Sequence, residues 1–406
     1  MSEMRLYHNP SSMTPLLPEA NGELRELAAE LLTNSGKLSG AFNEITRLSV
    51  ARLIEPMNSY YSNLIEGHFT HPLDIEKALK KDYSREPKKK LLQQESRAHV
   101  LVNHEMKTKL KSMDNLYDWH FISWLHKSFY DHVPVEFRTI TTKGNNTLLM
   151  EPGSLRETEV EVGDHIAPAA SSLSAFLEFF ANGYSRENIS DPLQRIIAMA
   201  ASHHRLAWIH PFLDGNGRVV RLFSEAVAII EKIDGGGLWS ISRGLAVHNK
   251  EYYSALHNAD MKRWNDYDGR GNLSEKNLVA FCKFFLESAI DQTKFMLSLL
   301  EPEKLTSRLK EFVDLMASRG ELRKESMFVL EEALFKGKIS RGDMERLTGK
   351  SENVARSIMK NLLGKELLIS ESSELRSPVI INFPVRYAPY IFPSLYPKDI
   401  EATMGN

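Results

Sequence analysis

The sequence contains little of what would tie it to an oxidising compartment or to a membrane. Its 406 residues include a single cysteine, Cys282, which excludes an internal disulfide framework and any cysteine-rich zinc module. The most apolar runs, such as 226–230, are far shorter than the roughly 18 residues that a membrane-spanning helix needs. The N-terminus, MSEMRLYHNP, lacks the apolar segment of a secretory signal peptide. We therefore expect a cytoplasmic protein with no membrane partner.

The net charge is small as well. The chain has 51 basic and 53 acidic side chains, so the formal net charge is −2 and the chain as a whole is no general binder of nucleic acid. Apolar residues make up 42% of the sequence, which is enough for a globular core. At roughly 150 residues per domain, the length predicts two to three domains.

Apolar residues at spacings of three and four dominate the chain and predict a mainly α protein. The stretch 22–55 is divided near 36–40, Pro56 marks a fresh helix start, and Gly67 marks a stop. Further helices are expected over 73–110, 117–130, 171–182, 191–208, 218–232 and 274–299.

One segment departs from the helical pattern. Between about residues 137 and 168 the composition shifts to Thr, Val and Gly, with turn-forming pairs at 144–145 and 152–153. This composition predicts one small β-hairpin inside a helical protein.

From about residue 305 the sequence predicts a separate unit. Residues 341–347 and 351–363 are typical of two helices around a turn at 348–350, and an alternating strand pair follows, as in a winged helix-turn-helix. Eight basic and four acidic residues between 336 and 366 give a local net charge of +4, which suits contact with DNA phosphates. Winged helices also serve as protein-docking or dimerisation modules, so either kind of partner stays open.

The chemistry concentrates in residues 210–221, HPFLDGNGRVVR, which lie between two expected helices. Gly215-Asn216-Gly217 forms a tight turn that leads directly into a helix N-terminus. The unpaired N–H groups and the positive dipole end of such a helix favour a phosphate group. Arg218 and Arg221 are three residues apart on that helix, so both can face the same anion.

Two further residues beside the turn add reactivity. Asp214 offers an oxygen ligand suited to Mg²⁺, a cation that proteins usually hold with few carboxylates and with nucleotide phosphates. His210 supplies a base whose ordinary pKa is near neutrality. Together these residues indicate metal-assisted chemistry on a nucleoside polyphosphate.

Three alternative structures fit this segment less well. A simple hairpin turn at Asp-Gly-Asn-Gly would need flanking strand patterns, which the sequence lacks. An EF-hand loop would need an oxygen ligand where Arg218 stands and a glutamate at its twelfth position. Gly215 and Gly217 also lack the third glycine of a dinucleotide-binding turn.

Residues 210–221 resemble the signature of Fic-domain proteins, His-x-Phe-x-Asp/Glu-Gly-Asn-Gly-Arg-x-x-Arg, and every defined position matches. Residues 192–208 resemble the helix that precedes this signature. Gly153-x-x-Arg156, with 160–163, resembles a hairpin on which targets dock. The resemblance implies a Fic-type helical core with a small β-hairpin flap. It also implies transfer of a nucleoside monophosphate, usually AMP from ATP, to a hydroxyl of a target protein.

The resemblance assigns roles to individual residues. His210 would deprotonate the incoming Ser, Thr or Tyr hydroxyl, Asp214 would hold Mg²⁺ against the α- and β-phosphates, and Phe212 would be buried beneath the loop. The phosphates would be held by the backbone of Gly215, Asn216 and Gly217 and by the side chains of Arg218 and Arg221. This is catalysis by alignment and charge stabilisation, with a base added.

A second motif concerns regulation. Residues 62–67, SNLIEG, match the family's inhibitory-helix pattern, Ser/Thr-x-x-x-Glu-Gly/Asn. Ser62 and Glu66 share one helix face, and Gly67 suits a C-terminal cap. The resemblance implies that Glu66 pairs with Arg221 and so keeps the resting enzyme off. The plain alternative is a surface glutamate before a helix stop.

The remaining expectations concern partners and boundaries. An exposed hairpin edge at 152–168 could align a target segment by main-chain hydrogen bonds. Tyr252 and Tyr253 resemble a family segment near the adenine, with Asp260 close by, although core packing explains either tyrosine almost as well. Self-modification and a homodimer stay open.

We expect an N-terminal helical region with the inhibitory helix (1–110), a Fic core (111–300) and a winged helix-turn-helix unit (301–406). The function expected first is an autoinhibited protein adenylyltransferase that uses ATP and Mg²⁺. The alternative is a nucleotide-sensing regulator that binds DNA through the C-terminal winged helix.

Overall fold

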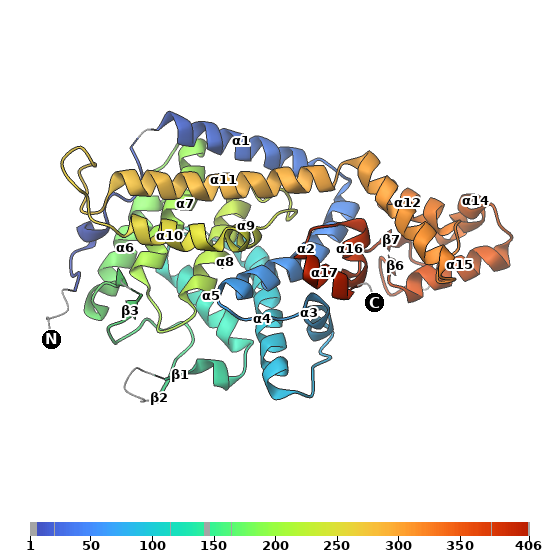
Figure 1. Ribbon diagram of the computed structural model, residues 1–406, viewed down its shortest axis with the longest axis horizontal. Helices are drawn as coiled ribbons and strands as arrows, with labels where there is room; N and C mark the ends of the chain where they lie inside the picture. Colours follow the sequence, from blue (N-terminus) through green and yellow to red (C-terminus); the bar gives the residue numbers. More distant parts are fainter. Residues whose placement is uncertain are drawn as a thin grey trace.

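The computed structural model describes residues 6–19, 21–113, 115–141, 147–163, 165–374 and 376–404. In this part of the chain the fold is mainly α with small antiparallel sheets, as the sequence predicts (Figure 1). The helices are α1 (Gly22–Ser39), α2 (Glu44–Ile65), α3 (Pro72–Leu79), α4 (Pro87–Lys109), α5 (Trp119–Asp131), α6 (Leu173–Tyr184), α7 (Pro192–Ile209), α8 (Asn216–Ile230), α9 (Ile241–Val247), α10 (Asn249–Ala259), α11 (Glu275–Leu299), α12 (Pro302–Ser318), α13 (Ser326–Lys336), α14 (Met344–Thr348), α15 (Glu352–Gly364), α16 (Ala388–Ile391) and α17 (Lys398–Met404). The strands are β1 (Thr139–Thr141), β2 (Thr147–Leu149), β3 (Glu161–Val162), β4 (His165–Ile166), β5 (Lys338–Ile339), β6 (Leu368–Ser370) and β7 (Val379–Ile381).

Helices α7 and α8 form the centre of the molecule, and α11 runs alongside α1 across them (Figure 1). Helix α7 begins where Asp191 accepts a hydrogen bond from the Leu193 N–H and Pro192 occupies the first helical position, which suits a residue without an N–H. Trp208 of α7 and Phe223 of α8 are buried, and their rings lie against Phe176 and Phe180 of α6. The core therefore fixes both helices that flank residues 210–215.

Two helix boundaries differ from the sequence-based expectation. Pro56 does not start a helix but lies inside α2, which is continuous and is packed against α4 and α9. That packing outweighs the hydrogen bond that proline cannot donate. The single helix expected over 73–110 is wrong as well, because α3 ends at Leu79 and α4 begins anew with Pro87 at its first position.

The region expected to hold one hairpin holds two. Strand β1 pairs with β2, with Thr139 opposite Leu149, and β3 pairs with β4, with Glu161 opposite Ile166. The hairpins are separate because Gly153, with φ 85°, is tied to helix α5 instead of to a strand. The pair 144–145 lies outside the described residues.

The C-terminal unit has the elements that the sequence predicts for a winged helix. Helices α14 and α15 meet at Gly349, whose φ of 62° allows the tight turn, and β5, β7 and β6 form an antiparallel sheet in that order. The assignment as a winged helix-turn-helix stays a prediction.

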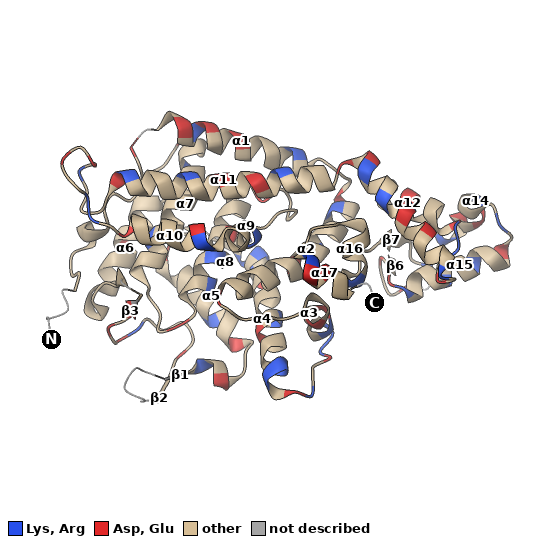
Figure 2. Ribbon diagram, in the orientation of Figure 1, with Lys and Arg blue, Asp and Glu red and all other residues tan. Residues whose placement is uncertain are grey.

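Basic and acidic side chains are interspersed over this unit (Figure 2). Six of its eight expected basic residues form ion pairs with glutamates: Lys336, Lys338, Arg346, Lys350, Arg356 and Lys365. The local positive charge is thus largely paired within the fold. Across the described ranges, the helices are too short or too polar to cross a membrane.

Candidate active site

The loop between α7 and α8 is held rigidly by its own residues. His210 ends α7 in the left-handed conformation, with φ 48°, and Gly215 has φ 77° just before α8. A Cβ at Gly215 would lie 2.7 Å from the Tyr130 hydroxyl oxygen, so the turn requires glycine. The Asn216 side chain closes the loop because its Oδ1 accepts from the Phe212 N–H (3.0 Å) and its Nδ2 donates to the Phe212 carbonyl (2.8 Å). Both polar atoms of the Asn216 side chain are thus used within the loop. Of the Asn216 donors, the backbone N–H is the one left to face a phosphate.

Phe212 is fully buried beneath this loop, as the family resemblance implies. Its ring stacks on that of His126, with centroids 4.0 Å apart. His126 also connects two segments, since its Nδ1 accepts from the Gly153 N–H (2.8 Å) and its Nε2 lies 3.2 Å from the Asp214 carbonyl oxygen. The loop is therefore fixed from below by helix α5.

A cavity of about 530 Å³ opens beside the loop, where His210 meets the first residues of α8. Its walls come from the end of α2, the β3–β4 hairpin, α7, α8 and α10. Burial, followed by the nearby charges of His165 and Arg156, lowers the pKa of His210 to about 4. The imidazole is thus neutral at physiological pH and can accept a proton.

The two arginines of the motif are buried and each is paired with a carboxylate. The Nη2 atom of Arg221 lies 2.6 Å from Glu66 Oε1, and Arg221 also donates to the side chain and backbone of Ser62 at 3.0 and 2.9 Å. The Nη2 atom of Arg218 lies 2.8 Å from Oε1 of Glu95, which is fully buried on α4. The sequence-predicted pair of Glu66 with Arg221 is therefore present in the geometry.

Glu66 lies where α2 ends and reaches over the start of α8. Gly67, with φ 78°, donates to the Leu64 carbonyl and the His68 N–H donates to the Asn63 carbonyl, which together form a Schellman cap. A Cβ at Gly217 would overlap Oε1 of Glu66, so this carboxylate lies directly against the α8 N-terminus. Burial raises the pKa of Glu66, but Arg221 and Arg218 outweigh it and hold the pKa below the ordinary value.

Asp214 lies at the solvent-exposed edge of the loop. The Tyr130 hydroxyl donates to its Oδ2 (3.1 Å) and so orients the carboxylate. The described residues contain no cluster of three or more His, Cys, Asp or Glu side chains suited to a metal. A single carboxylate nevertheless fits Mg²⁺ that takes its remaining ligands from phosphates and water.

The two adjacent tyrosines of α10 differ in their surroundings. Tyr252 is 3% exposed, and its hydroxyl lies 2.8 Å from His203 Nε2. Tyr253 is 49% exposed, lines the same cavity, and donates its hydroxyl to the Ile65 carbonyl (3.0 Å) at the end of α2. Tyr253 therefore offers a ring face to a ligand, whereas Tyr252 is mostly packed.

The β3–β4 hairpin is joined through Arg156 to the loop between α7 and α8. The Nε atom of Arg156 donates to the His210 carbonyl (2.8 Å), and its backbone N–H donates to the Pro211 carbonyl (2.9 Å). His165 of β4 lines the cavity and lies 3.6 Å from Asp260, which also lines it. Of the described residues in 152–168, Gly163 and His165 line the cavity; the docking of a target on this hairpin stays a prediction.

Sequence reasoning missed three residues that hold the site together: His126, Tyr130 and Glu95. None of them lies near residues 210–221 in the sequence. The one available signal was physical, because a buried arginine such as Arg218 requires an acidic partner somewhere in the chain. That requirement does not say which glutamate provides it.

Comparisons with known proteins agree with this geometry. The family model described as Fic/DOC family matches residues 118–228. A protein named "Protein adenylyltransferase Fic" from Nematostella vectensis is 40% identical over 78 residues, and its namesake from Drosophila melanogaster is 38% identical over 78 residues. These matches cover 19% of this chain and 18% and 16% of the two relatives, so the chain matches less than a fifth of either relative's length.

Solved structures show a similar fold. A Fic family protein from Desulfovibrio desulfuricans superimposes with a TM-score of 0.51 at 16% identity, over 90% of this chain and 97% of that one. A Fic domain containing signaling protein from Bacteroides thetaiotaomicron gives 0.51 at 17% identity, over 68% and 97%. Residues 118–228, which include the motif at 210–221, therefore form a Fic domain, and they are the part of the chain that matches the family model.

Proposed function

We propose that the chain is an autoinhibited, Mg²⁺-dependent protein adenylyltransferase, which transfers AMP from ATP to a hydroxyl side chain of a target protein. The observation that carries the proposal is the shared cavity that His210, the start of α8 and Arg221 all line. The relatives that match over 78 residues are named protein adenylyltransferases, which favours AMP transfer over other nucleotide chemistry.

The chemistry follows from the positions of the groups. The hydroxyl oxygen of the target attacks the α-phosphorus of ATP, and the bond from that phosphorus to the oxygen bridging the β-phosphate breaks. Pyrophosphate leaves, and the proton of the hydroxyl passes to a ring nitrogen of neutral His210. The rate gain comes from alignment and from charge stabilisation by groups already in place.

The phosphates would bind where anion-seeking groups gather. The backbone N–H groups at the start of α8 point along the helix axis toward the cavity side. The Nε atom of Arg218 is buried and has no hydrogen-bond partner among the described residues, which suits a phosphate oxygen. Asp214, oriented by Tyr130, would hold Mg²⁺, and the ion when bound would neutralise phosphate charge.

Autoinhibition is supported by the position of Glu66. Its carboxylate lies against Gly217 at the α8 N-terminus and pairs with Arg221, so it takes both the place and the partner of a terminal phosphate. ATP must displace this carboxylate to bind in a productive position. The resting activity is therefore expected to be low.

The test uses intact-mass measurement after incubation with Mg²⁺ and ATP. Glu66→Gly should raise AMP transfer to the chain itself or to added protein by about tenfold or more, because it removes a partly buried charged contact and frees Arg221. Adding His210→Ala to this variant should abolish the covalent product and leave ATP binding largely intact. Covalent AMP that survives His210→Ala, or a Glu66→Gly variant no more active than the wild type, would contradict the proposal.

The target would dock on the hairpin of residues 152–168. The β3–β4 hairpin borders the cavity through Gly163 and His165, and a strand edge aligns a peptide by main-chain hydrogen bonds with little regard for its sequence. A flexible segment of the same chain could use this edge too, which would give self-modification.

A further inference from the structure

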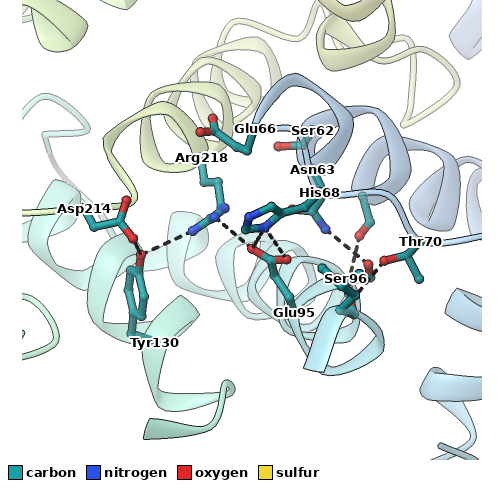
Figure 3. A network of polar contacts seen from close by, with 12 residues as sticks. Ser62, Asn63, Glu66, His68, Thr70, Glu95, Ser96, Tyr130, Asp214 and Arg218 are labelled. Carbon is teal, nitrogen blue, oxygen red and sulfur yellow. Dashed lines mark hydrogen bonds and ion pairs between the residues drawn. The ribbon is translucent and has the colours of Figure 1, made fainter. Parts of the chain in front are cut away.

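A chain of polar contacts connects the inhibitory segment to the catalytic loop (Figure 3). Its centre is Glu95 of α4, which is fully buried. The Glu95 carboxylate receives Arg218 Nη2 at 2.8 Å and His68 Nδ1 at 2.8 and 2.9 Å. On the far side, Arg218 Nη1 lies 3.2 Å from the Tyr130 hydroxyl oxygen, and that hydroxyl donates to Asp214. One carboxylate therefore serves both a motif arginine and the segment that follows Glu66.

His68 occupies a particular place in the inhibitory segment. It is the second residue after Glu66 and the first after the glycine that ends the Schellman cap, so it lies beyond the regular hydrogen bonds of α2. Its side chain is 37% exposed, and its hydrogen bond to Glu95 raises its pKa above the ordinary value against the opposing effect of burial. The contact is a charge-assisted one when His68 is protonated.

Neutral contacts also attach this region to α4. Ser59 and Asn63 bond the backbone and side chain of Ser96, and Thr70 bonds the Leu92 carbonyl. These contacts hold the body of α2 and the chain beyond it. His68 is the residue within this stretch whose partner, Glu95, also pairs with a motif arginine.

We propose that His68 is a positioning residue for the inhibitory glutamate, and that it acts by sharing the Glu95 carboxylate with Arg218. While His68 is bound to Glu95, the 66–68 segment is fixed and the Glu66 carboxylate stays against the α8 N-terminus. Without this attachment, Glu66 depends on its contact with Arg221, from which a phosphate can displace it. The inference rests on the proposed function, because it assumes that Glu66 opposes ATP.

The shared carboxylate gives Glu95 two opposite effects. It supports inhibition through His68, and it supports catalysis by holding Arg218 and, through Tyr130, the carboxylate of Asp214. Glu95→Gln should therefore raise activity when Glu66 is present and lower it when Glu66 is absent. Substitution of a residue with a merely structural role would lower the activity in both backgrounds.

The experiment compares variants in two backgrounds, wild type and Glu66→Gly. The readouts are the rate of AMP incorporation by intact mass and the affinity for Mg·ATP by calorimetry, which needs no target protein. His68→Ala should raise both by about tenfold in the wild-type background and change neither in the Glu66→Gly background, as expected for a lost charge-assisted hydrogen bond. His68→Asn, which keeps a donor near the position of Nδ1, should restore inhibition.

The matched control is His104→Ala. His104 of α4 bonds Glu55 of α2 at 2.7 Å, so it is another histidine–glutamate pair between neighbouring segments of the chain, away from the cavity. It should leave the basal rate and the ATP affinity unchanged. Thermal unfolding of each variant checks that the fold is intact, and half-exposed His68 can be truncated without opening the core.

The outcomes separate the two levels of the argument. If Glu66→Gly gains neither activity nor ATP affinity, the proposed function is at fault. If Glu66→Gly is activated while His68→Ala behaves as wild type, the role of His68 is wrong. If His68→Ala activates the enzyme equally in both backgrounds, the proposed role of His68 is also wrong, because the effect would then not depend on Glu66.

Discussion

At the scale of single residues, His210 shows how the fold prepares a side chain that would otherwise be partly protonated near neutral pH. The ring is enclosed at the end of α7, and Arg156 and His165 approach it from the hairpin. Each of these features disfavours the imidazolium form. The same enclosure therefore keeps the His210 ring neutral, as its proposed role as a base requires.

This property leads to a prediction about pH. A base must be neutral to accept a proton, so activity is lost as the pH falls through the pKa of the base. With the pKa of His210 at about 4, kcat/KM of the Glu66→Gly variant should be flat from pH 8 down to about pH 5.5 and fall toward pH 4. An ordinary histidine would instead lose about tenfold between pH 7.5 and 5.5. Initial rates with Mg·ATP across this range, with circular dichroism at each pH to show that the fold persists, make the measurement. An acid limb centred near pH 6.5 would contradict the burial argument.

Whether a residue of the site could be predicted depends on how far it lies from its partners in the sequence. Residues 210–221 could be predicted as a group, because a tight turn before a helix brings neighbours in the sequence together in space. The pairing of Glu66 with Arg221 could be predicted only through the resemblance. Glu95 and Tyr130 reach Arg218 through the packing of α4 and α5 on α8, which no local pattern encodes.

At the scale of elements, helix α2 is the one that the sequence describes least well. Its pattern shows a break at Pro56, yet the helix runs unbroken from Glu44 to Ile65 because neighbours cover it on several sides. The opposite error occurs at Pro87, where α4 begins although the sequence pattern over 73–110 predicts one continuous helix. Periodicity predicts which residues are helical better than it predicts where one helix stops, since tertiary contacts decide the ends.

The end of α2 is also bonded to α10, and this contact can be tested by itself. Tyr253→Phe keeps the ring in the cavity and removes the hydrogen bond to the Ile65 carbonyl. We expect basal AMP transfer to rise about two- to tenfold, because one neutral hydrogen bond holding the inhibitory end is lost. In the Glu66→Gly background the rate and the KM for ATP should stay within about twofold of the parent. A raised KM without activation would mean that the hydroxyl serves the nucleotide instead.

At the scale of the whole molecule, the expected division at 1–110, 111–300 and 301–406 stays a prediction, while the contacts across it are extensive. Thr46 near the start of α2 donates its hydroxyl to the Leu334 carbonyl of α13 (2.7 Å). Tyr61 of the same helix donates to the Leu395 carbonyl (3.1 Å) near the C-terminus. The C-terminal unit is therefore packed along α2, from Thr46 near its start to Tyr61, five residues before Glu66. Sequence patterns describe each unit separately and do not contain this joint surface.

A matched pair of variants tests whether α2 transmits changes along its length. Thr46→Val keeps the shape of a fully buried side chain and removes its donor to Leu334, which should cost about 1 kcal/mol of unfolding free energy in a guanidinium titration. Thr46 is twenty residues from Glu66, about 30 Å along a helix, and the segment between them is packed on α4 and α9. Basal AMP transfer should therefore stay at the wild-type level, in contrast to Tyr253→Phe. If Thr46→Val activates the enzyme as much as Tyr253→Phe does, then α2 moves as a rigid body, and the C-terminal unit would control the inhibitory glutamate directly.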